Sequence, residues 1–119
     1  MIGLTDIAYS GPGRPIDGYG QGFFRIGGAV FRGAVIAAPD GARLWGGFSD
    51  IASLLSLKGQ IDVLLLGMGA KMAYADPAMT SLLEADGIAV EPMTSPSAAR
   101  SYNILLSEGR RVAAAMLPV

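Results

Sequence analysis

The apolar positions of this chain are most concentrated at residues 61–66, which end in the run Val63-Leu64-Leu65-Leu66. An unbroken aliphatic run has no polar face, so it predicts a short strand that is covered on both sides, as in a parallel α/β sheet. The following residues, Gly67-Met68-Gly69, allow a sharp turn at the edge where ligands of open α/β sheets usually bind. We therefore expect this strand to lie at the centre of the fold.

The first half of the chain predicts an antiparallel meander of about three strands. Residues 21–26 and 29–38 are largely apolar and flank Gly27-Gly28, a pair that suits hairpin turns in which both central residues have positive φ. Pro39-Asp40-Gly41 then fits a type I turn and returns the chain along residues 42–45. The sequence thus favours one hairpin and one further strand beside it.

The Gly27-Gly28 turn also predicts the two faces of the hairpin. Counting back from the turn places Phe24 opposite Phe31 on one face and, on the other, Arg25 opposite Val30 and Phe23 opposite Arg32. We expect the first face to be core and the second to carry both arginines.

The residues before the hairpin predict an extended arm. Residues 1–18 contain Gly3, Gly11, Gly13 and Gly18 with only short apolar pieces between them. Residues 5–9 are a candidate edge strand, and an unpaired edge would offer a route to a homodimer.

The second half predicts alternating helices and strands. Each expected helix has a capping side chain before it, apolar residues spaced at three and four, and a glycine beyond its end. The caps are Ser49 or Asp50, Asp76 before Pro77, and Ser95 before Pro96, and the strands between the helices cover residues 61–66, 87–91 and 110–116. The expected fold is α/β: a single three-layer domain over residues 1–119, in which the antiparallel meander is followed by a βαβαβ layer on a mixed central sheet.

Composition narrows the chemistry that this chain can perform. The chain has no Cys and no His, which removes disulfides, thiolate nucleophiles, Ser-His-Asp triads and His-ligated metals. Nine basic and ten acidic residues give a net charge of −1, so no overall field attracts nucleic acid. No apolar run reaches the roughly 18 residues of a membrane span. We expect no cofactor and no metal. Because residues 1–15 lack the pattern of an export or organelle signal, we expect a cytoplasmic location.

Three groups of residues are candidates for chemistry. The Gly67-Met68-Gly69 turn could bind a small anion or polar ligand, but it does not fit a dinucleotide site because Met72 occupies the third glycine position. Lys71 and Tyr74 could form a catalytic pair or an ordinary exposed loop. Phe23, Arg25 and Arg32 form a candidate protein interface, or their stems simply cover the sheet.

Three blocks of sequence resemble one known family. They are Leu64-Leu65-Leu66-Gly67-Met68-Gly69, Val90-Glu91-Pro92-Met93-Thr94, and the run from Ser101-Tyr102-Asn103 to Leu117-Pro118. Together they resemble the small domain family that includes mitochondrial respiratory complex I assembly factor 3 and the adipogenesis-associated protein. The resemblance extends from the Gly-Phe-Phe-Arg-Ile hairpin to the terminal Leu-Pro, and without a mitochondrial targeting arm the chain resembles a bacterial member.

This resemblance implies a compact three-layer domain with a mixed sheet, and a protein that assists assembly together with another protein. It supplies no catalytic residues. The matched positions imply that a shared binding pocket would be formed by Gly67, Met68, Gly69, Thr94, Tyr102 and Asn103.

The function we expect is that of a non-enzymatic interaction protein, an assembly or chaperone-like factor for respiratory complex I or another membrane-associated complex. Its partner would be a protein, which could hold it at the membrane surface. A small-molecule or anion-binding domain that uses the Gly67-Met68-Gly69 turn is one alternative. An enzyme that works without His or Cys is another.

Overall fold

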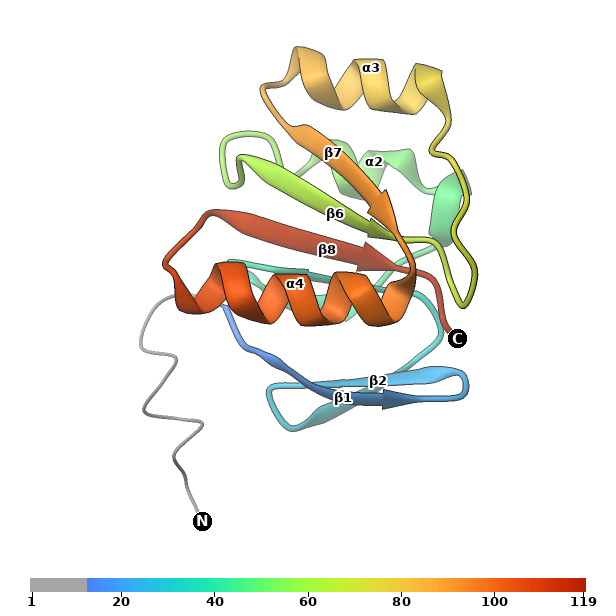
Figure 1. Cartoon of the computed structure of the whole chain (residues 1–119). Coiled ribbons are helices and arrows are strands. Elements are labelled where there is room, and N and C mark those ends of the chain that lie inside the picture. The colour runs from blue at the N-terminus through green and yellow to red at the C-terminus, as the bar shows by residue number, and fades with distance from the viewer. Residues whose placement is uncertain (1–12) are drawn as a thin grey trace.

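A five-stranded sheet forms the middle of the molecule in the computed structural model, which describes residues 13–119 (Figure 1). The strand order is β5-β4-β8-β6-β7. The strands are β4 (Val35–Ala38), β5 (Gly41–Leu44), β6 (Val63–Gly67), β7 (Ala89–Met93) and β8 (Val112–Met116). The aliphatic run is therefore an inner strand, as predicted.

The sheet is mixed, and β8 is where its two halves meet. Strand β6 runs parallel to both β7 and β8, with Leu65 opposite Glu91 on one side and Ala114 on the other. On its far side β8 pairs antiparallel with β4, where Ile36 lies opposite Ala115. The parallel half and the antiparallel half thus share a single strand.

Alternate side chains of the inner strands pack into two separate hydrophobic cores, one on each face of the sheet, which gives the fold three layers. Leu64 and Leu66 pack with helices α2 (Ile51–Leu55) and α3 (Pro77–Ala85) on one face. Leu65 packs on the other face with helix α4 (Ser95–Ser107) and with a small second sheet. All of these leucines are at most 2% exposed, so both faces of β6 are covered, as the run predicted.

The second sheet contains β1 (Ile16–Gly20), β2 (Phe23–Ile26) and β3 (Ala29–Arg32). The register of its hairpin is confirmed, and the pairs are Phe23 with Arg32, Phe24 with Phe31, Arg25 with Val30 and Ile26 with Ala29. Phe24 is completely buried, whereas Arg25 and Arg32 are exposed. The prediction that one face of the hairpin is core and that the other carries both arginines is confirmed.

The predicted antiparallel first half is confirmed, but it has more than the three expected strands, because residues 16–44 form five strands in two sheets. The expected strand over residues 29–38 is interrupted at Gly33-Ala34, where Gly33 has a φ of 107° and the chain crosses from β3 to β4. Part of the expected arm is strand β1, which pairs antiparallel with β2. The candidate edge strand at residues 5–9 lies outside the described residues.

The helix caps follow the sequence signals with one correction. Asp50 accepts a hydrogen bond from Ser53 N, and Asp76 caps α3 in the same way through Ala78 N. For α4 the cap is Thr94 rather than Ser95, because the Thr94 side chain accepts from Ser97 N. Ser95 is the first residue of the helix and is fully buried. The Thr94 hydroxyl, one position earlier, occupies the capping position, and the Ser95 hydroxyl instead bonds to Gly69 N and Leu117 O.

Strand β7 is one edge of the large sheet. The Ala89 N–H donates to Asp62 O and the Met93 carbonyl accepts from Met68 N, so alternate residues of β7 face the body of the sheet. Pro92 therefore faces the open edge, where its missing N–H blunts pairing with another strand. None of the helices within residues 13–119 combines the length and apolar character that a membrane crossing requires.

Candidate functional site

The glycine turn after β6 is packed against the first residue of α4. A Cβ on Gly67 would lie 2.7 Å from Ser95 Oγ and 2.8 Å from Met116 Cγ, so only glycine fits there without displacement. Gly69 has a φ of 93°, a left-handed conformation that glycine adopts without strain. The turn is therefore fixed by close packing at one glycine and by backbone conformation at the other.

The polar groups of this turn bond within the chain. Gly69 N donates to Ser95 Oγ at 2.9 Å, and that hydroxyl donates to Leu117 O at 2.6 Å. Met68 N donates to Met93 O at 2.7 Å. An anion at the turn would have to displace these contacts, because the N–H groups of Met68 and Gly69 are already engaged.

The other residues of the predicted pocket have internal partners as well. Thr94 caps α4, and Asn103 both donates to Ile16 O and accepts from Ile16 N at 2.8 Å, which fastens β1 to the helix. Tyr102 is fully buried in the core between α4 and the small sheet. Burial raises the pKa of Tyr102 to about 12 because the ionised phenol would lose its hydration. Its hydroxyl finds no hydrogen-bond partner within the described part of the chain.

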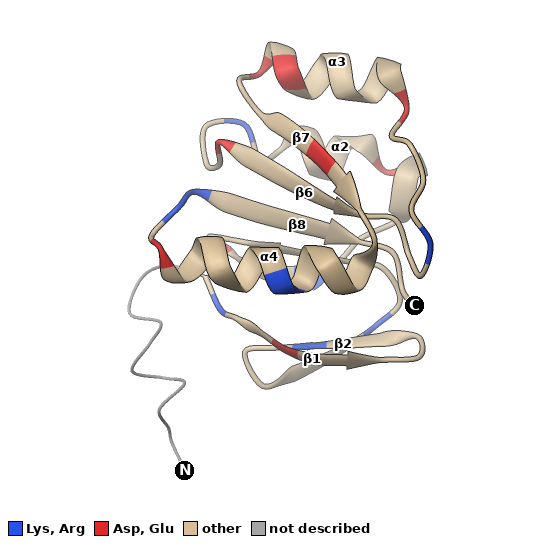
Figure 2. Cartoon of the chain, in the orientation of Figure 1, with Lys and Arg blue, Asp and Glu red and all other residues tan. Residues whose placement is uncertain are grey.

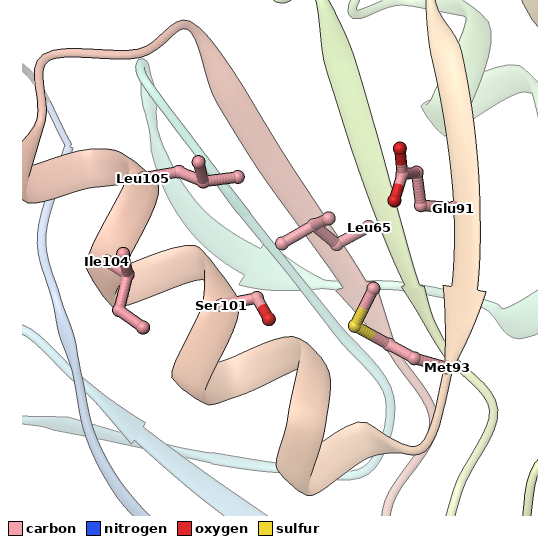
Figure 3. Close-up of a pocket in the computed structure, with 6 residues that line it drawn as sticks. All are labelled: Leu65, Glu91, Met93, Ser101, Ile104 and Leu105. Carbon is pink, nitrogen blue, oxygen red and sulfur yellow. The ribbon is translucent and has the colours of Figure 1, made fainter.

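A cavity of about 200 Å³ opens elsewhere, between α4 and β7 (Figure 3). We call it the α4/β7 groove, and it is lined by Leu65, Glu91, Met93, Ser101, Ile104 and Leu105. None of the residues predicted as site residues lines it. Ile104 is an apolar residue of α4 that is 54% exposed in the structure. The sequence could not predict this exposure, because it depends on which strands α4 covers.

The outer face of the small sheet carries the predicted interface. We call it the arginine face and define it by Phe23, Arg25, Val30 and Arg32. The Arg32 guanidinium lies 5.9 Å from the Phe23 ring centroid, within cation–π range. Val30 is 50% exposed, and basic positions of the small sheet are visible below α4 in Figure 2. The structure brings these residues to one surface.

The arginines of this face have no carboxylate partner among residues 13–119, where the ion pairs join Arg43 to Asp40, Lys58 to Asp86 and Arg111 to Asp62. The acid on the neighbouring strand β1, Asp17, accepts a hydrogen bond from Gly28 N at 2.7 Å. The arginine face is therefore a basic surface with aromatic and aliphatic contact area.

Lys71 and Tyr74 lie in the exposed connection between β6 and α3. The Tyr74 side chain is 93% exposed, so no neighbouring group desolvates or orients it. This is the exposed loop that was the second interpretation of the pair. Across residues 13–119 no three side chains of the His, Cys, Asp and Glu types gather in a group that could hold a metal ion.

Comparison with protein-family models gives a match over residues 16–117 to the family described as protein of unknown function DUF498/DUF598. A Rhodobacter capsulatus protein described as uncharacterized is 56% identical over 88% of this chain and 85% of its own length. The NADH dehydrogenase [ubiquinone] 1 alpha subcomplex assembly factor 3 of Danio rerio is 36% identical over 89% of this chain. The match covers 65% of that factor, and 60% of its Mus musculus counterpart, which is 32% identical.

Solved structures give the same picture. The crystal structure of an outer membrane protein from Bartonella henselae has a TM-score of 0.83 at 33% identity and covers 93% of this chain and 98% of that one. A Bordetella pertussis protein described as an Mth938-like domain has a TM-score of 0.75 at 29% identity and covers 88% and 85%. The mixed sheet with its helices and its second small sheet is the fold of these neighbours.

Proposed function

Because this chain belongs to the DUF498/DUF598 family, which it shares with assembly factors of NADH dehydrogenase, we propose that it is a non-enzymatic assembly factor for such a respiratory complex. The partner would be a subunit of the complex, or a second assembly protein that carries the subunit. The protein would then act at the membrane surface through its partner. The observation on this chain that carries the proposal is the arginine face.

The composition of the arginine face supports binding to a protein. Arginine and aromatic residues are enriched where protein interfaces contribute most of their binding energy. Arg25 and Arg32 are exposed and project from paired strands, so a partner meets them on a rigid surface. Their carboxylate partners are absent from residues 13–119, which leaves both guanidinium groups available to an acidic surface. We infer that the partner presents carboxylates to this face.

The candidate chemistry of the chain supports binding rather than catalysis. The sequence has neither His nor Cys, and the Lys71 and Tyr74 side chains lie in an exposed loop. The α4/β7 groove, at about 200 Å³, is smaller than the roughly 300–1,000 Å³ of typical small-molecule sites. Its polar side chains are those of Glu91 and Ser101, and within residues 13–119 no hydrogen bond joins the Ser101 hydroxyl to the Glu91 carboxylate as nucleophile and base.

The experiment is capture of NADH dehydrogenase subunits from soluble and membrane fractions with tagged protein. Wild type is compared with the double variant Arg25→Glu, Arg32→Glu. We expect wild type to recover subunits of the complex and the double variant to recover at least about tenfold less. A tenfold weaker affinity corresponds to a loss of about 1.4 kcal/mol of binding free energy. Reversal of two exposed charges leaves the core untouched, so both proteins should unfold at similar temperatures.

The matched control is the double variant Lys71→Glu, Arg110→Glu, which changes the net charge equally at two other exposed positions. It should recover the same subunits as wild type. Equal recovery by all three proteins would refute the arginine face as the docking surface. Failure of wild type to recover any subunit of the complex would refute the assembly role itself.

A further inference from the structure

The α4/β7 groove forms because α4 covers the inner strands β6 and β8 but leaves the flank of β7 open (Figure 3). Leu65 forms its floor, with Leu105 on the helix side and Met93 on the strand side. Ile104 stands at the rim and is 54% exposed. The surface thus offers an apolar recess beside an exposed apolar side chain, at a distance from the arginine face.

The size of the recess indicates what can occupy it. An engineered apolar cavity of about 150 Å³ is large enough for benzene, whereas drug-sized ligands need roughly 300 Å³ or more. A recess of about 200 Å³ therefore fits one leucine, methionine or phenylalanine side chain of a partner. It is too small for a nucleotide or a similar cofactor.

The charge at the recess indicates which charge the occupant carries. Glu91 lines it from β7 and is exposed, and the ion pairs formed within residues 13–119 do not include it. An apolar recess with the Glu91 carboxylate in its lining matches an apolar side chain with a cation next to it.

The edge of the sheet argues for a helical occupant. Ala89 and Met93 direct their backbone groups toward β6, so in β7 the open edge presents the Val90 N–H, while Pro92 has none. An added strand would find too few donors to extend the sheet. A helix satisfies its own backbone hydrogen bonds and requires only side-chain contacts.

We propose that the α4/β7 groove is a second docking site, which takes an apolar side chain from a basic amphipathic helix of a partner protein. Glu91 pairs with a Lys or Arg located one turn from the inserted side chain. This site selects a partner opposite in charge to the one that fits the arginine face. It does not depend on the respiratory role, since the groove and its charge are properties of the chain itself.

The test uses a synthetic amphipathic helix of about 16 residues, long enough to form a stable helix, with a leucine stripe flanked by lysines. Binding is followed by methyl NMR, because Leu65, Met93, Ile104 and Leu105 all carry methyl groups in the groove. We expect shift changes centred on these four residues. A matched peptide with glutamates in place of the lysines should bind wild type more weakly.

Charge reversal at Glu91 identifies the ion pair. In Glu91→Lys, the Kd for the lysine peptide should rise roughly five- to tenfold at low ionic strength, and the glutamate peptide should regain the affinity that the lysine peptide loses. The control Glu84→Lys makes the same charge change on the outer side of α3 and should leave both Kd values unchanged. Equal effects of the two variants would refute the pairing.

Filling the groove tests the recess independently of charge. Ser101→Leu places an apolar side chain in the cavity, so it should raise the melting temperature and abolish peptide binding. Lack of peptide binding to wild type at millimolar concentration would overturn the proposal, as would shift changes located elsewhere. Shifts of the groove methyls on dilution without peptide would also overturn it, because they would identify a second copy of this chain as the occupant.

Discussion

The substitution Tyr102→Phe tests the packing of α4 against the small sheet. The Tyr102 hydroxyl is fully buried and has no hydrogen-bond partner within residues 13–119. A buried hydroxyl without a partner costs roughly 1–3 kcal/mol, and its removal leaves the ring contacts in place. We therefore expect the phenylalanine variant to be more stable than wild type by about 1 kcal/mol at pH 7.

The same substitution should change how stability depends on pH. The pKa of Tyr102 is raised to about 12 in the folded chain, against 10.0 for the free group. Between these two values the unfolded chain loses its proton while the folded chain keeps it, so stability falls as the pH rises. At pH 11 the loss amounts to about 1.4 kcal/mol, and it should be absent from Tyr102→Phe.

The assay is urea unfolding at pH 7, 9 and 11, followed by the fluorescence of Trp45. This residue is the chain's single tryptophan and is 5% exposed, so unfolding transfers it to water. Tyr74→Phe is the matched control, because the Tyr74 ring is already in solvent and its loss should leave the curves unchanged. If Tyr102→Phe is less stable than wild type by more than about 1 kcal/mol at pH 7, the hydroxyl has a partner and the reasoning is wrong.

Two further predictions concern the fastening of α4. Asn103→Ala removes both hydrogen bonds to Ile16 and should lower the free energy of unfolding by about 1–3 kcal/mol, with faster amide exchange at Ile16 if β1 detaches. Gly67→Ala places a methyl group against Ser95 and should lower the free energy of unfolding by about 1–3 kcal/mol. The control Gly18→Ala has open space around the added methyl group and should change the free energy of unfolding little. Denaturant titration compares the two variants, and equal effects would contradict the close packing at the turn.

Local signals in the sequence predicted much of the fold. The aliphatic run 63–66 specifies a strand covered on both faces, and Gly27-Gly28 sets the hairpin register, because neither depends on distant residues. The interruption of the expected strand at Gly33-Ala34 could not be predicted, because the strand after it, β4, pairs with β8, about eighty residues later in the chain. The glycines of β1 obscured its strand pattern in the sequence. In the structure the strand is fastened by hydrogen bonds between Ile16 and the Asn103 side chain of α4.

The candidate sites divide in the same way. The arginine face depends on a two-residue turn and a period of two, so its residues could be named from the sequence. The α4/β7 groove depends on where a helix lies across a sheet, and no local pattern states that α4 leaves β7 open. Ser95 shows the same limit at one residue: its spacing before Pro96 suggested a cap, while its hydroxyl joins Gly69 to Leu117.

The position of β8 has a consequence for synthesis of the protein. A ribosome makes this strand after all the others described, yet it is the strand that joins β4 to β6. Until it emerges, the β4 and β6 edges that it will fill are open, and open edges of apolar strands are sites of aggregation. Until β8 has been made, the nascent chain therefore carries two unfinished half-sheets, and a chain truncated before Val112 should be recovered as aggregate rather than as a smaller fold.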